Sequence, residues 1–410
     1  MFVFVQNQHG SPLMPCTPAK ARRLLNAGKA KVLRRTPFTL KLLYGCSGYK
    51  QSVVAGMDTG THTLGCAAVA NGQVVYQSEV SLRTDISQKM QQRAMYRRTR
   101  RGRKTRYRKP RGRNRASMRK KGRIAPSVRS KIESHLREKK QVESILPVTL
   151  WKVETASFDT HKLTNPDVSS LGYREGAQKG FYNVKAYVID RDGYRCQSRQ
   201  KVEHDKVLQV HHKVFRSQGG TNTPDNLVTL CRRCHEDLHA GMFALKARKS
   251  KTKQATEVGI VKAQLKKRWR FEETYGYETK YKREQCLGLP KSHANDAVAI
   301  CCRDGERVRL DDVLYLKRHV AAGDYQQTKG VRSEKRIPTG KLFGLRKHDL
   351  VRTEKGTGWV KGKRSTGFFA LETIDGETLT TSVNVKKATT RLAARTTTLT
   401  QRKGGASSPL

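Results

Sequence analysis

The stretch from 209 to 239 brings imidazoles to both sides of a short hairpin. Alternating residues at 210–214 predict a strand, a Gly-Gly pair follows as a loop, and 227–230 predicts a second strand. The stretch ends in a predicted short helix that carries His235 and His239 four positions apart, and therefore on one face. The sequence thus predicts a hairpin followed by a helix.

Such a unit can hold one divalent cation between its first strand and its helix, and leave a neighbouring imidazole to take a proton from water. That chemistry indicates phosphodiester hydrolysis. The order His-His, Asn, His resembles the HNH nuclease motif. The resemblance implies that His212 is the general base and that Asn226 braces the loop positioning it. It also implies that His211 and His235 hold the metal, whereas His239 is either a further ligand or a solvent-facing helix residue.

The neighbouring cysteines leave two interpretations open. Cys231 and Cys234 have the Cys-x-x-Cys spacing of half a zinc knuckle, but the half that begins at Cys196 has Arg199 where its second cysteine is expected. A zinc ion is therefore doubtful. Either a substitute such as His204 completes the ligand set, or reduced cysteines pack a small core.

The charge of the chain indicates a polyanionic partner. Its 410 residues suffice for two or three domains, but only 36% of them are hydrophobic and the net charge is +50. Nucleic acid is the partner that relieves such self-repulsion. We expect no membrane partner, because no apolar run is long enough to span a bilayer and the first ten residues lack the pattern of a signal peptide. Nine cysteines in no regular framework fit a reducing cytosol.

A long basic segment, 86–132, contains no acidic residue. Asp85 is predicted to cap a helix that reaches about Gly102. The planar guanidinium group of arginine donates paired hydrogen bonds to phosphate oxygens, and Tyr96 and Tyr107 can stack on exposed bases. The alternative is a nonspecific basic linker. The arginines expected to bind RNA are Arg97, Arg98, Arg100, Arg101, Arg103, Arg106 and Arg108.

The chain begins with a predicted small basic α/β module. Thr17 is the expected helix N-cap, Pro18 the first helical residue and Gly28 the stop, with strands at 31–34 and 39–44. Residues 12–15 read Pro-Leu-Met-Pro. This sequence resembles the N-terminal signature of the IscB family, transposon-encoded RNA-guided nucleases related to the type II CRISPR effectors.

Acidic residues at three separate places extend this resemblance. Asp58 ends a predicted buried strand, Glu154 ends another, and a helix capped by Ser292 carries His293 and Asp296 in its first turn. The resemblance implies a RuvC-type site on a ribonuclease H-like sheet, with His293 as a proton-transfer or orienting residue. Hard oxygen ligands of this kind suit a pair of Mg²⁺ ions. The nearby Asp159 competes with Glu154 but fits a structural role better.

These motifs predict a multidomain α/β protein that acts as an RNA-guided DNA endonuclease. The resemblance implies that the HNH site, with one Mg²⁺, cuts the DNA strand paired to the guide, and that the RuvC site cuts the displaced strand. The expected partners are a guide RNA and a double-stranded DNA target, in a monomeric ribonucleoprotein of the prokaryotic cytosol or nucleoid. Two alternatives stay open: a homing-type HNH endonuclease that uses no guide, and a non-catalytic or weakly active RNA-binding protein of a mobile element.

The expected domain order follows from these motifs. It is an N-terminal PLMP-type module at 1–50, RuvC segment I at 51–83, an arginine-rich bridge helix at 84–126, RuvC segment II at 127–164, a ββα-metal HNH module at 165–246, RuvC segment III at 247–305 and a C-terminal β-rich region at 306–410.

Segments after the HNH module receive coarser predictions. Residues 260–271 have helical spacing and 275–281 read as a basic strand. Alternation between 343 and 385 predicts a small antiparallel barrel that binds guide RNA or reads a motif beside the target. The Thr-, Gly- and Ser-rich tail from about Thr396 is expected to be disordered.

Overall fold

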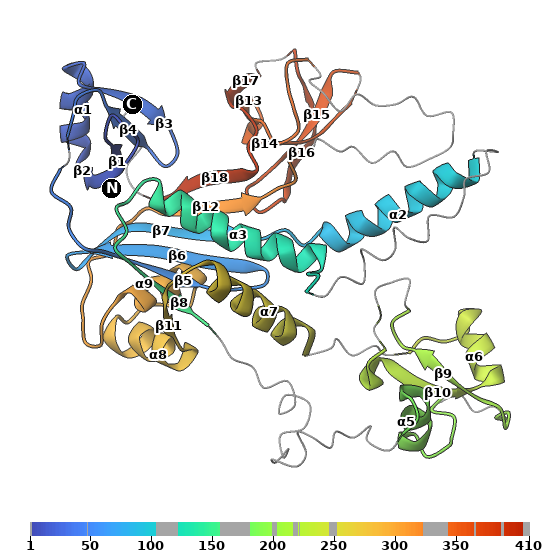
Figure 1. Ribbon diagram of the computed structural model, residues 1–410. Helices are drawn as coiled ribbons and strands as arrows, with labels where there is room; N and C mark the ends of the chain where they lie inside the picture. Colours follow the sequence, from blue (N-terminus) through green and yellow to red (C-terminus); the bar gives the residue numbers. More distant parts are fainter. Residues whose placement is uncertain are drawn as a thin grey trace. The chain divides into compact units, whose positions relative to one another are not determined.

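The computed structural model divides the chain into two compact units (Figure 1). The larger unit combines Met1–Ala156 with Val258–Leu410, and the smaller unit is Ser157–Glu257. The smaller unit therefore interrupts the larger one in sequence. The structure describes residues 2–46, 48–103, 122–155, 181–198, 203–215, 220, 222–245, 252–322, 343–364, 366–386 and 389–404.

A seven-stranded mixed sheet organises the larger unit. Strand β5 lies near its middle, with the parallel strands β8 and β11 on one side and the antiparallel β6 on the other. Because β8 precedes the smaller unit and β11 follows it, chain from both sides of the interruption completes one sheet. In spatial order the strands are β11 (Glu272–Thr274), β8 (Leu150–Glu154), β5 (Val53–Asp58), β6 (Thr63–Ala70), β7 (Gln73–Ser81), β12 (Leu314–His319) and β18 (Thr398–Lys403).

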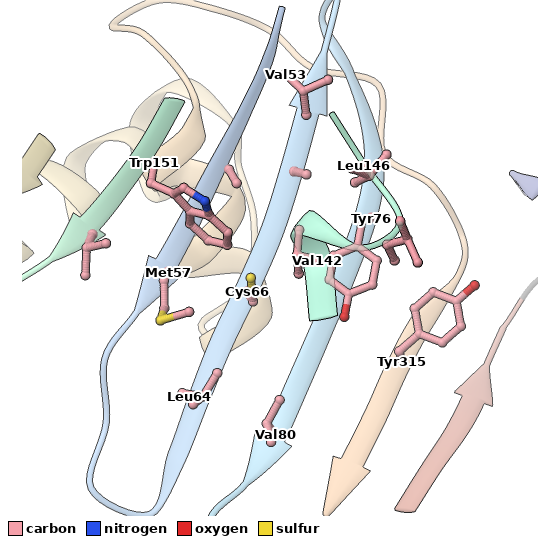
Figure 2. Close-up of a cluster of buried hydrophobic side chains, with 14 of the residues drawn as sticks. Val53, Met57, Leu64, Cys66, Tyr76, Val80, Val142, Leu146, Trp151 and Tyr315 are labelled. Atoms are coloured by element: carbon pink, nitrogen blue, oxygen red, sulfur yellow. The ribbon is translucent and has the colours of Figure 1, made fainter. Parts of the chain in front are cut away.

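Helices cover both faces of this sheet. The helices α3 (Pro126–Glu143) and α7 (Thr252–Arg268) pack on one face. Figure 2 shows Met57, Cys66 and Tyr76, from three adjacent strands, on the face that also receives Val142 of α3. The alternate side chains point to the other face, where they contact α9 (His293–Cys301). Burying each large apolar side chain in such a core stabilises the fold by about 1.5–3 kcal/mol.

Two glycines allow α9 to lie directly against the sheet. A Cβ atom at Gly65 would lie 1.7 Å from the carbonyl oxygen of His293, and one at Gly56 would lie 2.4 Å from that of Ala297. Any side chain at either position would push the helix away from β5 and β6. The glycines thereby fix the position of the first turn of α9.

A buried ionic group joins α3 to the sheet. Glu138 and Lys317 are fully buried, and their side chains lie 2.6 Å apart. The same Glu138 oxygen accepts hydrogen bonds from the hydroxyls of Tyr76, at 2.7 Å, and Ser78, at 2.9 Å. Since removing one partner of a buried pair costs about 3–5 kcal/mol, this group fixes how α3 sits on β7 and β12.

The N-terminal module is a four-stranded sheet with one helix. Thr17 caps that helix by accepting a hydrogen bond from the Lys20 amide, Pro18 is its first residue, and Gly28 has a left-handed φ of +66° beyond its end. These features were predicted and are confirmed. The elements are β1 (Val3–Gln6), β2 (Pro12–Cys16), α1 (Pro18–Asn26), β3 (Ala30–Arg34) and β4 (Thr39–Leu42), and the strand order is β2-β1-β4-β3.

The predicted strands near the C-terminus form an antiparallel five-stranded sheet. Its order is β16 (Thr378–Asn384), β15 (Phe368–Glu372), β14 (Gly356–Lys363), β13 (Leu350–Thr353) and β17 (Thr390–Ala393).

The prediction of a disordered tail from about Thr396 is wrong as far as Lys403. Residues 398–403 form β18, which pairs with all six residues of β12 and buries Leu399. The threonines that suggested disorder are β-branched and suit a strand once β12 offers a free edge. Residues 405–410 lie outside the described part of the chain.

The predicted strand at 275–281 is also wrong. The strand β11 ends at Thr274, and α8 (Gly276–Tyr281) follows it. The Glu278 side chain accepts a hydrogen bond from the Tyr275 amide and closes a capping box that starts the helix. The strand was predicted because tyrosines occur two positions apart, as residues on one face of a strand do.

Among its described residues, the smaller unit has two α-helices that flank a hairpin. The helix α5 (Val184–Arg191) precedes the antiparallel strands β9 (Leu208–His212) and β10 (Leu227–Cys231), and α6 (Arg232–His239) follows them. Arg191 donates hydrogen bonds to the carbonyls of Pro224 and Leu227, which ties α5 to the hairpin. The predicted hairpin and helix are therefore confirmed.

Candidate functional site

The acidic residues predicted from three segments meet at one edge of the seven-stranded sheet. Asp58 and Glu154 are the last residues of the parallel neighbours β5 and β8, and they are direct partners in the register. Ser292 caps α9 by accepting a hydrogen bond from the Asn295 amide. That cap places His293 and Asp296 in the first turn of the helix.

A hydrogen bond joins α9 to the end of β5. His293 Nδ1 lies 2.6 Å from Asp58 Oδ2. This bond raises the pKa of His293, which favours its charged form. His293 therefore holds the Asp58 carboxylate in one orientation.

The remaining two carboxyl groups have raised pKa values. Burial, followed by repulsion from Asp58 and Asp296, raises the pKa of Glu154, and the neighbouring Thr279 hydroxyl opposes the shift. Burial and Asp58 likewise raise the pKa of Asp296. Like charges held together in this way favour a bound cation or a proton.

Arg283 is a member of this site that sequence reasoning missed. Its buried guanidinium lies 2.6 Å from Asp296. The positive charge partly offsets the rise in the pKa of Asp296 that burial causes. Arg283 belongs to a short π-helical segment, Lys282–Cys286, and no local motif marks it. The competing Asp159 lies outside the described residues.

The three carboxylates do not form a compact ligand cluster. In the described part of the chain, two groups of three or more metal-ligand side chains have their ligand atoms within 4.8 Å of one another, and both belong to the smaller unit. Asp58, Glu154 and Asp296 are not among them.

The first group is a cluster of three imidazoles. His211 of β9 meets His235 and His239 of α6, with ring centroids 4.9 and 5.0 Å away. Burial, and then the other imidazoles, lower the pKa of His211 to about 4, and burial and His239 lower that of His235. The lowered pKa values favour the neutral form of His211 and His235, the form in which an imidazole binds a metal. His239, whose role the sequence left open, points into the cluster.

His212 lies beside this cluster on the neighbouring position of β9. Its Nε2 atom lies 2.8 Å from the Oδ1 atom of Asn222, which sequence reasoning did not single out. His212 is the last residue of β9 and directly follows His211. An imidazole of the cluster and the imidazole that contacts Asn222 thus occupy adjacent residues.

Asn226 braces the backbone that follows β9. Its side chain accepts a hydrogen bond from the Val214 amide at 2.9 Å and donates one to the Val214 carbonyl at 3.1 Å. A Cβ atom at Gly220 would lie 1.8 Å from the same carbonyl, so only glycine fits there. Asn226 thus holds the backbone two residues beyond His212.

The second group combines three cysteines and a histidine. Cys196, His204, Cys231 and Cys234 bring their ligand atoms within 4.8 Å of one another. His204 Nδ1 lies 3.6 Å from the Cys231 sulfur and 3.5 Å from that of Cys234. Of the two interpretations left open by the sequence, this arrangement favours the substitute ligand, because three thiolates and one imidazole form a zinc-binding set. Arg199 lies outside the described residues.

The electrostatics of this group also suit a cation. Against burial, the Cys234 amide and His204 lower the pKa of Cys231 to about 6. Burial raises the pKa of Cys234 to about 12. Both sulfurs lie close to the His204 imidazole, at 3.6 and 3.5 Å. A cation bound among them would stabilise the deprotonated form of both thiols.

The predicted RNA-binding arginines are described only in part. The helix α2 (Ile86–Arg103) carries Arg97, which is exposed, and the backbone of Arg98, Arg100, Arg101 and Arg103. The side chains of those four residues, and the whole of Arg106 and Arg108, lie outside what the structure describes.

Comparison with known proteins assigns the smaller unit. Residues 194–241 match the family model described as HNH endonuclease. The smaller unit contains an HNH endonuclease domain. Residues 3–176 match a second family model, described as RRXRR protein. At a coarse level these two matches agree with the resemblance drawn from the sequence.

A curated relative supports the nuclease assignment. The chain is 36% identical over 62 residues to the type IV methyl-directed restriction enzyme EcoKMcrA of Escherichia coli strain K12. The match covers 14% of this chain and 22% of the enzyme, so the chain spans about a fifth of that relative's length.

A separate finding concerns membranes. Among the described residues, each helix is too short or too polar to cross a bilayer.

Proposed function

We propose that this protein is an RNA-guided DNA endonuclease with one nuclease site in each unit. The observation that carries the proposal is the split sheet. Asp58 and Glu154 precede the HNH domain in sequence and Asp296 follows it, yet all three lie at one sheet edge. An HNH endonuclease acting alone has no need to interrupt a second acidic site.

The imidazole cluster is proposed as the HNH active site. His212 takes a proton from the attacking water, while Asn222 and the loop braced by Asn226 hold its ring in position. HNH nucleases depend on divalent metals, and His211, His235 and His239 offer three imidazole donors to one ion. A cation bound there would polarise the scissile phosphate and stabilise the leaving oxygen. Three imidazoles suit a transition metal such as Zn²⁺ or Mn²⁺ better than the Mg²⁺ expected from the sequence.

The sheet edge is proposed as a RuvC-type site. Asp58, Glu154 and Asp296 offer carboxylate oxygens of the kind that Mg²⁺ prefers. The raised pKa values of Glu154 and Asp296 reflect burial and mutual repulsion, which a bound cation would relieve. A pair of ions bound there would activate water and stabilise the leaving oxygen. His293 orients Asp58 through its 2.6 Å hydrogen bond. Arg283 orients Asp296 in the same way.

The basic surface of the larger unit supports RNA as a partner. The helix α2 begins the acid-free segment and carries exposed Arg97. A separate cavity of about 660 Å³ is lined by Arg34, Arg35, Arg137 and Lys140, and no acidic side chain is among its described lining residues. Four cations around one cavity favour a phosphate backbone.

The cysteine cluster is proposed as a structural zinc site. A closed set of four ligands leaves no open position for a substrate, so the ion would hold the start of α6 against the segment around Cys196 and His204. That position keeps His235 and His239 facing β9.

One experiment separates this proposal from its rivals. The full chain is purified with any RNA that accompanies it, and cleavage of a duplex carrying the complementary sequence is measured with and without ribonuclease treatment. RNA-dependent cutting is expected. Cutting that persists without RNA would identify a guide-free HNH endonuclease, and bound RNA without cutting would identify an RNA-binding protein.

Two substitutions assign the strands. Asp58→Ala should leave a nick only in the strand paired to the guide, and His212→Ala only in the displaced strand. If either variant still makes a double-strand break, the corresponding site is misassigned.

A further inference from the structure

The helix α8 carries exposed tyrosines directly beside the sheet-edge carboxylates. Tyr275 and Tyr277 are 48% and 72% exposed, although large aromatic side chains usually bury most of their surface. Their rings are stacked, with centroids 5.9 Å apart and planes inclined by 10°. Two nearly parallel rings are thus largely exposed to solvent.

The residue between these tyrosines contacts the proposed active site. A Cβ atom at Gly276 would lie 3.1 Å from the Oε1 atom of Glu154. One turn further on, the Thr279 hydroxyl acts on the same carboxyl group and lowers its pKa. The start of α8 therefore forms one wall of the carboxylate site, and the two rings flank the point of contact.

Local packing does not account for these rings. Tyr277 contacts Glu278 of its own helix through its hydroxyl, at 3.2 Å, and its ring remains in solvent. Tyr281, four residues further on and on the same side of the helix, is 58% exposed. The apolar core of the sheet is complete without any of the three.

We propose that Tyr275 and Tyr277 form a stacking platform for unpaired bases of the DNA strand cut at the carboxylate site. This inference rests on the proposed function of that site. A phosphodiester held by Glu154 brings its own nucleotides next to α8. Bases in a duplex are stacked inside and cannot reach the rings, whereas a displaced single strand presents them freely.

Charges of both signs surround these rings. Lys280 on α8 and Arg270 before β11 are exposed, and so is Glu272 of β11. The rings, and not the charges, therefore indicate a nucleic acid ligand, because aromatic side chains that stack on bases are a general feature of single-strand binding sites. Stacking tolerates any base, so the platform holds the strand without selecting a sequence.

Photocrosslinking tests the platform without relying on cleavage. The probe is a single-stranded oligonucleotide containing 5-iododeoxyuridine, mixed with the full-length chain and an excess of unlabelled duplex DNA that occupies nonspecific cationic surface. Crosslinks located by mass spectrometry should fall on Tyr275 or Tyr277. Crosslinks that occur only elsewhere would overturn the proposal.

Matched variants separate stacking from folding. The double substitution Tyr275→Ala and Tyr277→Ala should weaken binding of the oligonucleotide by about fivefold or more, because each stacked base contributes measurably. The double substitution to Phe keeps both rings and should keep the affinity. Tyr49→Ala, which removes a ring 87% exposed elsewhere in the larger unit, is the control. If the double Ala variant binds as tightly as this control, the platform does not exist.

Strand-resolved cleavage distinguishes this proposal from the function on which it rests. The double Ala variant should cut the displaced strand more slowly and the guide-paired strand at the normal rate. If the unaltered protein cuts no displaced strand, the proposed function of the carboxylate site fails, while the crosslinks still decide whether the tyrosines bind single-stranded DNA.

Discussion

At the scale of single residues, tertiary neighbours decide what each side chain can do. His239 looked like either a ligand or a solvent-facing residue because helical spacing alone cannot distinguish the two. Packing α6 against β9 places it 5.0 Å from His211, ring to ring. Arg283 carries no sequence signal, yet its charge acts directly on Asp296.

The role of His239 can be tested by metal binding. His239→Ala should weaken binding of Co²⁺ to the imidazole cluster by at least about tenfold, since even the loss of a residue that supports a ligand costs 10–100-fold. Visible absorption during a titration reports the change. His9→Ala, which removes an exposed histidine of the larger unit, is the control and should leave the imidazole band unchanged. Equal Co²⁺ affinity with and without His239 would exclude it as a ligand.

A buried histidine on β12 predicts how stability depends on pH. Burial and Arg137 lower the pKa of His319 from 6.5 to about 4, and neither ring nitrogen has a hydrogen-bond partner among the described residues. Between these two values the unfolded chain binds a proton that the folded chain does not. Stability should therefore fall as the pH drops from about 6.5 towards 4, by on the order of 3 kcal/mol at most.

Unfolding in denaturant across this pH range checks the prediction. His319→Phe should make the slope shallower, because Phe cannot take up the proton. His9→Phe, which removes an exposed histidine, should leave the slope unchanged. An unaltered slope in the His319 variant would show that its ring is already charged or solvated in the folded state.

At the scale of elements, local signals predicted what local interactions determine. The Thr17 and Ser292 caps, the hairpin of the HNH domain and the strands that end at Asp58 and Glu154 could be read from the sequence, since each depends on residues a few positions apart. The strand β18 could not, because its polar, threonine-rich segment becomes a strand only when the distant β12 offers an edge. The segment of α8 was predicted to be a strand from its alternating residues, but a capping box starts a helix there.

The contribution of β18 can be measured by truncation. A chain that ends at residue 397 loses the strand and exposes the edge of β12, as well as the pocket that receives Leu399. We expect a lower melting temperature and concentration-dependent association, because an unpaired strand edge recruits other chains. A chain that ends at residue 404 keeps β18 and should behave as the full-length protein. If both truncations melt at the same temperature, the pairing contributes nothing to stability.

At the scale of the whole molecule, the HNH domain interrupts the chain segments that form the seven-stranded sheet. The sequence predicted that the HNH module separates the second acidic segment from the third, and the fold shows that chain from both sides of it belongs to one sheet. The two units have separate cores, and the core of the smaller one is modest. Its described buried apolar residues are Val188, Leu227, Val228, Leu230, Cys231, Cys234, Leu238 and Ala255. A core of that size needs additional support.

Removing zinc should therefore unfold the smaller unit alone. A structural zinc ion contributes on the order of 10 kcal/mol of folding free energy, more than a few buried side chains supply. Cys234→Ala should make residues 194–241 sensitive to trypsin and abolish cutting of the guide-paired strand, while the larger unit keeps its melting temperature and its cutting of the displaced strand. A zinc chelator should reproduce the proteolysis in the unaltered chain. Cys46→Ala, at a half-buried cysteine of the larger unit, controls for the loss of a thiol. If the Cys234 variant resists trypsin as the unaltered protein does, the four side chains are a packed core and not a metal site, and the smaller unit folds without zinc.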